Sequence, residues 1–257
     1  MTSFAALHRP GSPLLLPNAW DHASAAMLAG QGFAAIGTTS LGVAAAAGLP
    51  DGTGATREET LRLARRLGGE PFLVSVDVEA GFSDDPSEVA ELAAELAAAG
   101  VAGINLEDGR ANGSLAPVAL QAAKITAVKA AAPGLFVNAR TDTHWIGGHE
   151  PETTGRLDAY QQAGADGVFV PGLSDPDGIA SLVRHLAIPL NILLSPTGPA
   201  FPQLAGLGVA RVSLGSLLYR LALGAASAAA VAVRDGRPAG GPDTPVPSYA
   251  EVQRLVR

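Results

Sequence analysis

The sequence contains no cysteine, and this absence excludes several kinds of chemistry. Disulfide bonds, thiolate metal ligands and cysteine nucleophiles are all ruled out. Basic residues are also scarce, because 17 Lys and Arg stand against 24 Asp and Glu and give a formal net charge of −7. A surface of this charge does not attract nucleic acid or an anionic membrane, so we expect neither as a partner.

Long uncharged apolar runs are missing as well. A membrane-spanning helix needs about 18 uncharged apolar residues, and the nearest approach, 214–233, is rich in weakly apolar Ala and contains Arg220. The N-terminus has no basic start, apolar run and cleavage site of the kind that marks a signal peptide. These features lead us to expect a cytoplasmic protein.

Apolar residues make up 47% of the 257 residues, and they fall in short runs that alternate with helical patterns. The expected strands are 13–16, 34–38, 72–76, 101–106, 135–139, 166–170, 190–193 and 210–214. The expected helices are 21–31, 57–67, 86–99, 117–131, 152–163, 175–185, 199–206 and 216–233. A Pro/Gly-rich segment, 235–247, then leads to a last short helix, 248–256.

Eight successive strand–helix units predict a (β/α)8 TIM barrel. We expect one domain over 1–257, with a C-terminal helical extension from about 216. The alternative fold is an open doubly wound sheet, which usually carries a Gly-rich phosphate turn after its first strand. Residues 17–21 (Pro-Asn-Ala-Trp-Asp) form no such turn, so the barrel is favoured.

Three of these strands end in polar residues. The run 72–76 is followed by Asp77 and Glu79, the run 101–106 by Glu107 and Asp108, and the run 135–139 by Arg140 and Asp142. A charge at the end of a buried strand is costly unless it is paired, hydrated or bound to a metal. Three such ends indicate one shared polar site at the carboxyl-terminal rim of the sheet.

The acidic residues of this rim suit a hard cation. Few, oxygen-only ligands are typical of Mg²⁺ or Mn²⁺, which keep several bound waters. Alternatively, the acids cap the following helices or pair with Arg140. The guanidinium of Arg140 can bind a substrate carboxylate in bidentate fashion, form a salt bridge to Glu107 or Asp142, or do both.

Three other segments provide further candidates. Thr39 and Ser40, after the second strand, can form an anion cradle at a helix start or serve only as caps. Asp51 follows that helix turn and can return to the same rim or lie in a plain surface turn. Asn191 interrupts an apolar strand, which indicates either a ligand contact or a buried hydrogen-bond network.

Taken together, these segments resemble the isocitrate lyase/phosphoenolpyruvate mutase superfamily, and most closely its short, carboxyphosphonoenolpyruvate phosphonomutase-like members. The similarity runs from about residue 16 to residue 220. The segments that carry it are 16–21 (LPNAWD), 39–44 (TSLGVA), 48–52 (GLPDG), 77–82 (DVEAGF), 103–108 (GINLED), 138–142 (NARTD) and 189–192 (PLNI).

The resemblance implies a (β/α)8 barrel whose last helix is swapped with a neighbouring subunit in a homo-oligomer, a tetramer or a dimer. It implies Mg²⁺ (or Mn²⁺) held directly by Asp77, with Glu79 and Glu107 holding its waters. It also implies that a small α-keto acid or dicarboxylate lies against Thr39, Ser40 and Leu41. Asp51 would lie nearby, Arg140 would clamp the carboxylate, and Asn191 would contact the distal end.

The chain departs from the family pattern at three places. Glu79 stands where Asp is common, and Pro171 stands where the mutases have His. The loop 109–115 (GRANGSL) lacks the Lys-Lys-Cys-Gly-His sequence of the lyases, whose Cys is the general acid. From the resemblance we expect a C–C bond lyase acting next to an α-keto acid. The alternatives are a phosphonopyruvate-type C–P mutase or hydrolase, and a non-catalytic α-keto acid binder, which the missing Cys favours.

Overall fold

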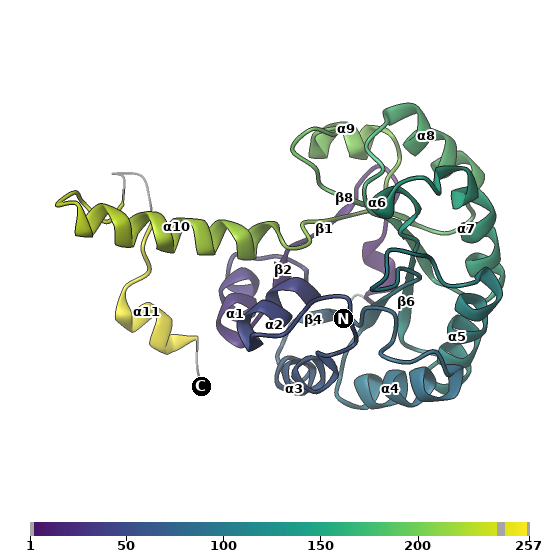
Figure 1. Ribbon diagram of the computed structural model, residues 1–257, viewed down its shortest axis with the longest axis horizontal. Coiled ribbons are helices and arrows are strands. Elements are labelled where there is room, and N and C mark those ends of the chain that lie inside the picture. Colours follow the sequence, from purple (N-terminus) through teal and green to yellow (C-terminus); the bar gives the residue numbers. More distant parts are fainter. Residues whose placement is uncertain (1–2, 241–244, 256–257) are drawn as a thin grey trace.

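In the computed structural model, which describes residues 3–240 and 245–255, nine parallel strands form a nearly closed barrel surrounded by helices (Figure 1). The α/β barrel prediction is confirmed. The strands are β1 (Leu14–Leu16), β2 (Asn18–Ala19), β3 (Ala35–Thr38), β4 (Leu73–Asp77), β5 (Gly103–Glu107), β6 (Phe136–Arg140), β7 (Gly167–Val170), β8 (Leu190–Leu193) and β9 (Arg211–Ser213).

The ninth strand arises because the first predicted strand is split at Pro17. β1 pairs with β9, whereas β2 pairs with β3, so the two pieces join the first and last parts of the sheet. Proline has no N–H to donate to a strand ladder, but its carbonyl still accepts from the N–H of Gly37 at 2.8 Å. The split therefore lets one short segment close the barrel.

The predicted helices are present, with ends within about two residues of their expected positions. They are α1 (His22–Gly30), α3 (Arg57–Leu67), α4 (Pro86–Ala98), α5 (Val118–Ala131), α7 (Thr153–Gln162), α8 (Pro176–His185), α9 (Phe201–Gly206), α10 (Leu217–Arg234) and α11 (Tyr249–Arg254). Residues 241–244 of the predicted 235–247 segment, and residue 256 of the predicted last helix, lie outside the described residues.

Two α-helices of the described residues have no counterpart among the ranges expected from the sequence. They are α2 (Ser40–Ala47), of which we expected only the start, and α6 (Thr143–Ile146). α6 is a single turn, too short to show a helical period in the sequence. Both follow barrel strands directly, so both lie where loops commonly build a site.

Residues 4–8 pack against the amino-terminal end of β6. Phe4 and His8 flank a short 3-10 helix (Ala5–Leu7), and both rings contact Phe136 at the start of β6, with centroid distances of 5.4 and 4.3 Å. Burial, with the nearby Arg211 charge, lowers the pKa of His8 to about 4. The histidine is therefore neutral at physiological pH and belongs to the core.

Helix α10 projects away from the barrel (Figure 1). Its 18 residues have a mean hydropathy of 1.4, long and apolar enough on those two measures to cross a bilayer, although Arg220 and Arg234 lie within it. Leu221 and Leu223 are 58% and 54% exposed. Within 3–240 and 245–255, no other segment covers these apolar side chains. The cytoplasmic location stays a prediction.

Helix α7 is tied to the rim of the barrel by a fully buried carboxylate. Asp108 accepts hydrogen bonds from the hydroxyl of Tyr160 at 2.6 Å and from Nη1 of Arg156 at 3.2 Å. It also accepts from the hydroxyl of Thr141 and the backbone N–H of Asp142, both at 2.8 Å. One side chain thus joins the outer helix to the segment that follows β6.

We expect Asp108→Ala to lower the free energy of unfolding by about 3 kcal/mol, because it leaves a buried guanidinium and hydroxyl without their acceptor. Tyr160→Phe removes one charged hydrogen bond and should cost about 1.5 kcal/mol. Urea denaturation measures both, with the exposed Glu91→Ala on α4 as the control. A change of less than about 1 kcal/mol for Asp108→Ala would show that the network is not stabilising.

Candidate active site

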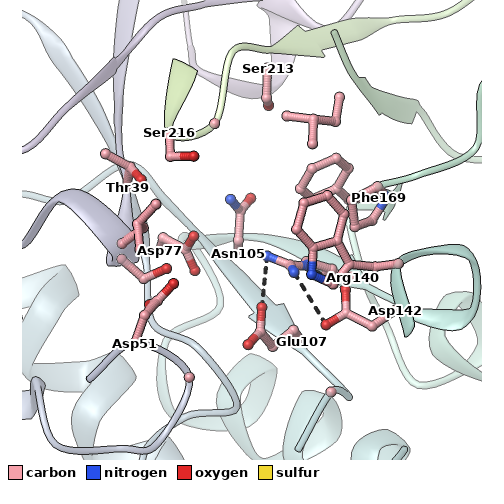
Figure 2. A pocket seen from close by; sticks show the side chains of 18 of the residues that line it. Thr39, Asp51, Asp77, Asn105, Glu107, Arg140, Asp142, Phe169, Ser213 and Ser216 are labelled. Carbon is pink, nitrogen blue, oxygen red and sulfur yellow. Dashed lines mark hydrogen bonds and ion pairs between the residues drawn. The ribbon is translucent and has the colours of Figure 1, made fainter. Parts of the chain in front are cut away.

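A pocket of about 360 Å³ opens at the carboxyl-terminal rim of the barrel (Figure 2). It brings together seven of the residues expected at the site from the sequence. These are Thr39, Ser40, Leu41, Asp51, Asp77, Glu107 and Arg140. The remaining two, Glu79 and Asn191, are buried outside the pocket wall.

Arg140 lies at the centre of the charged part of the pocket. Its Nη1 is 2.7 Å from Oε2 of Glu107, and its Nε is 2.6 Å from Oδ1 of Asp142 (Figure 2). Although burial opposes its charge, Glu107 and Asp142 raise the pKa of Arg140, so the guanidinium stays charged. Both salt bridges weighed from the sequence are therefore present, and the anion-binding role of Arg140 stays a prediction.

The carboxylates opposite Arg140 are held in a costly environment. Burial raises the pKa of Asp77 to about 6, against the attraction of Arg140 and with the help of the nearby Asp51 charge. Burial likewise raises the pKa of Glu107 well above its usual range, despite the ion pair to Arg140. A cation placed between these carboxylates would relieve their repulsion.

The donor set fits a water-rich divalent cation rather than an enclosed metal site. Across 3–240 and 245–255, no group of three acidic, histidine or cysteine side chains is arranged to hold a metal ion by itself. Mg²⁺ needs only one or two direct carboxylates and keeps its waters. Asp77 and Glu107, which line the open pocket, match that requirement.

Glu79 occupies a different position from the one expected of a metal-water ligand. Its carboxylate accepts hydrogen bonds from the N–H of Gly54 and the hydroxyl of Thr56, and so fixes the loop that follows Asp51. The backbone of Glu79 is in the left-handed region, at φ 50°, which is uncommon for a residue with a side chain. The expected contact of Glu79 with metal-bound water stays a prediction.

The start of helix α2 presents unused donors to the pocket. Its N-cap residue, Thr39, makes no side-chain capping hydrogen bond, whereas Asp21, Asp85 and Asp175 cap their helices. The hydroxyl of the preceding Thr38 instead accepts from the N–H of Asp77 at 2.9 Å. Among the residues that the structure describes, nothing accepts from the first N–H groups of α2, so these groups are available to an anion.

Asn191 belongs to a polar layer inside the barrel. Its amide exchanges hydrogen bonds with the hydroxyl of Ser213 on the neighbouring strand, at 2.9 and 3.2 Å. Asn105, in turn, accepts from Asn138 at 2.9 Å and from Arg211 at 3.1 Å. The structure therefore places Asn191 in a buried network below the pocket, and a contact with substrate stays a prediction.

Several pocket residues were not singled out from the sequence. They are Asn18, Asn105, Trp145, Phe169, Ser213 and Ser216. Asn105 carried a usable signal, because it lies in register with Asp77 on the next strand and is a polar residue within an apolar run. Trp145 carried none, since it lies on the single-turn helix α6.

Fold and rim together define a parallel α/β barrel with an acidic, arginine-containing ligand pocket. Residues 4–234 match the phosphoenolpyruvate phosphomutase family. An uncharacterized protein of Mycobacterium tuberculosis is 48% identical over 99% of this chain and 96% of its own. An oxaloacetate decarboxylase of Pseudomonas entomophila is 32% identical over 86% of this chain and 80% of its own.

A solved structure gives the same relationship. The phosphonopyruvate hydrolase in complex with oxalate and Mg²⁺ matches with a TM-score of 0.79 and 26% identity, over 95% of this chain and 90% of that one. The chain belongs to the isocitrate lyase/phosphoenolpyruvate mutase superfamily.

The raised pKa of Asp77 has a consequence for stability. An aspartate in the unfolded chain has a pKa of about 3.9, whereas the folded value is about 6. Ionisation is therefore less favourable in the folded state, and stability is lost as the pH rises from about 4 to 6. Without added divalent cation, we expect Asp77→Asn to raise the free energy of unfolding at pH 7.5 by roughly 2 kcal/mol, and by much less at pH 4.5.

Urea denaturation at the two pH values measures this effect. The control is Asp85→Asn. Hydrogen bonds from Ser87 lower the pKa of that exposed carboxyl, so ionisation of Asp85 stabilises the folded state, whereas ionisation of Asp77 destabilises it. If Asp77→Asn changes the free energy of unfolding by the same amount at both pH values, the raised pKa of Asp77 is contradicted.

Proposed function

We propose that the protein is a Mg²⁺-dependent enzyme that breaks a C–C bond next to the carbonyl of a small α-keto acid. One observation carries this proposal. The uncapped start of α2, the Asp77 carboxylate and the Arg140 guanidinium all face one pocket (Figure 2). Such a reaction requires hydrogen-bond donors for the substrate carboxylate, a carboxylate that can bind a metal ion, and a fixed positive charge.

The superfamily relatives support this choice. The oxaloacetate decarboxylase relative is named for the cleavage of a C–C bond in an α-keto acid. The related phosphonopyruvate hydrolase structure holds both oxalate and Mg²⁺. Oxalate carries two adjacent carboxylates, so it shares with an α-keto acid a carboxylate next to a second oxygen.

In this proposal each group has a separate task. The N–H groups at the start of α2, with Thr39 and Ser40, bind the substrate carboxylate. Asp77 would hold the cation directly, and Glu107, which is paired to Arg140, would orient its waters. When bound, the cation would stabilise negative charge on the carbonyl oxygen of the substrate.

The loop after β5 bears on which group could protonate the departing fragment. The loop 109–115, which lines the pocket through Gly109, Arg110, Ala111 and Gly113, contains no Cys, Lys or His. This composition favours a second candidate function, an α-keto acid binder that does not turn over its ligand. The two functions share the binding site and differ only in product release.

Calorimetry with oxalate tests the shared site. We expect oxalate to bind only with Mg²⁺ present, and Asp77→Ala to weaken that binding at least about 100-fold, because it removes the direct metal ligand. The matched control, Glu91→Ala, removes an exposed acid on α4 and should bind as the parent does. Oxalate binding that ignores Mg²⁺ or survives Asp77→Ala would overturn the proposed site.

Product assays then separate the candidate functions. Release of an α-keto acid from isocitrate-like or malate-like substrates, or decarboxylation of oxaloacetate, supports the lyase. Phosphate release from phosphonopyruvate identifies a hydrolase instead. Binding without any product supports the binder.

We also propose that the chain forms a homo-oligomer, a tetramer or a dimer, in which α10 packs on a second copy. The support is the exposed apolar set of Leu221, Leu223, Val231 and Val233 on a helix that leaves its own barrel (Figure 1). Light scattering should give a multiple of 25.8 kDa. The double variant Leu221→Lys/Leu223→Lys should lower that mass while Glu91→Lys keeps it, and a monomeric parent would refute the assembly.

A further inference from the structure

The pocket has two chemically different halves, which follow from the order of the strands. Asp51, Asp77 and Glu107 come from the β3–β5 side of the barrel. The opposite side, contributed by α6, β7 and β8, is apolar. Its lining residues are Trp145, Ile146, Phe169, Pro171 and Leu193.

The positive charges of the pocket are already paired. Within the described part of the chain, the pocket wall contains two guanidinium groups, those of Arg110 and Arg140, and no lysine or histidine. Arg140 is buried between Glu107 and Asp142. Arg110, on the loop that follows β5, pairs with Asp84 at 2.7 Å.

A charge comparison limits what the pocket can accept. Four carboxylates line it, from Asp51, Asp77, Glu107 and Asp142, and Arg140 is the guanidinium paired with two of them, whereas Arg110 is paired with Asp84 outside the lining. One divalent cation together with Arg140 leaves one negative charge, and the substrate carboxylate then adds a second beside the start of α2. A second substrate carboxylate would lie against apolar side chains without a cation, which is a costly burial.

Trp145 gives an independent indication of an apolar ligand. The residue lines the pocket and is 60% exposed, although indole rings are among the most favourable groups to cover. The guanidinium of Arg140 lies 5.7 Å from the ring centroid of Phe169, so the deeper part of this wall is already packed. Trp145, Ile146 and Leu193 keep exposed surface that a ligand could cover, whereas Phe169 and Pro171 are buried.

We propose that this pocket selects an α-keto monocarboxylate with an aliphatic chain, rather than a dicarboxylate such as oxaloacetate or 2-oxoglutarate. This inference rests on the proposed function, because it places the keto-acid end against α2 and Asp77. The aliphatic chain then crosses the pocket and lies on Leu193 and Trp145. The substrate of the lyase is then a larger molecule whose C–C bond cleavage releases this α-keto monocarboxylate.

Calorimetry in saturating Mg²⁺ at pH 7.5 tests the selection with four ligands besides oxalate. They are pyruvate, 3-methyl-2-oxobutanoate, oxaloacetate and 2-oxoglutarate. Each added buried methylene should tighten binding about fourfold, so 3-methyl-2-oxobutanoate should bind about tenfold or more tightly than pyruvate. Both dicarboxylates should bind more weakly than pyruvate.

Two variants test where the chain lies. Trp145→Ala should reduce the preference for 3-methyl-2-oxobutanoate over pyruvate several-fold, whereas Tyr249→Ala, which removes an exposed aromatic ring on α11, should keep it. Leu193→Arg should reverse the preference towards 2-oxoglutarate by supplying the missing cation. Since Trp145 is exposed, its replacement leaves a folded protein even if Leu193→Arg does not fold.

The outcomes separate the two levels of the proposal. Failure of oxalate to bind with Mg²⁺ overturns the proposed function itself. If oxalate binds but oxaloacetate or 2-oxoglutarate binds more tightly than 3-methyl-2-oxobutanoate, the site stands and the selection is wrong. A selective loss of dicarboxylate binding in Arg110→Ala would likewise overturn the selection, by showing that Arg110 reaches a second carboxylate.

Discussion

The site depends on the ion pairs that Arg140 makes with Glu107 and Asp142. Glu107 and Arg140 are the last residues of neighbouring strands and lie directly in register, so the backbone ladder itself places the two charges side by side. Without the guanidinium, burial would leave an uncompensated group of acids at the rim. The fold therefore tolerates these buried carboxylates because the strand register places the Arg140 guanidinium beside them.

That arrangement is supported from outside the barrel. The N–H of Asp142 is held by Asp108, and Asp108 is held by Arg156 and Tyr160 on the outer helix α7. A shift of α7 would therefore be transmitted through two side chains to the partner of Arg140. The packing of α7 therefore helps to fix the geometry of the site, as expected where supporting hydrogen bonds hold the residues that contact ligand.

The sequence was informative where one rule acted alone. Buried strands appear in the sequence as apolar runs, and the carboxyl ends of parallel strands meet at one rim. The sequence alone therefore predicts that Asp77, Glu107 and Arg140 lie together. It was uninformative where local backbone geometry decides direction. Glu79 is two residues from Asp77, yet its positive φ turns it towards Gly54 and Thr56. No pattern of residue types in the sequence predicts the positive φ of Glu79.

The two halves of the pocket also differ in how they are built. The charged half stands on strand ends and buried ion pairs, where a change would disturb the barrel. The apolar half includes Trp145 on the short helix α6, where side chains can be exchanged with little effect on the core. A fold divided in this way can keep one metal-and-anion chemistry while the distal wall changes the substrate. The different reactions named for members of this superfamily are what such a division would produce.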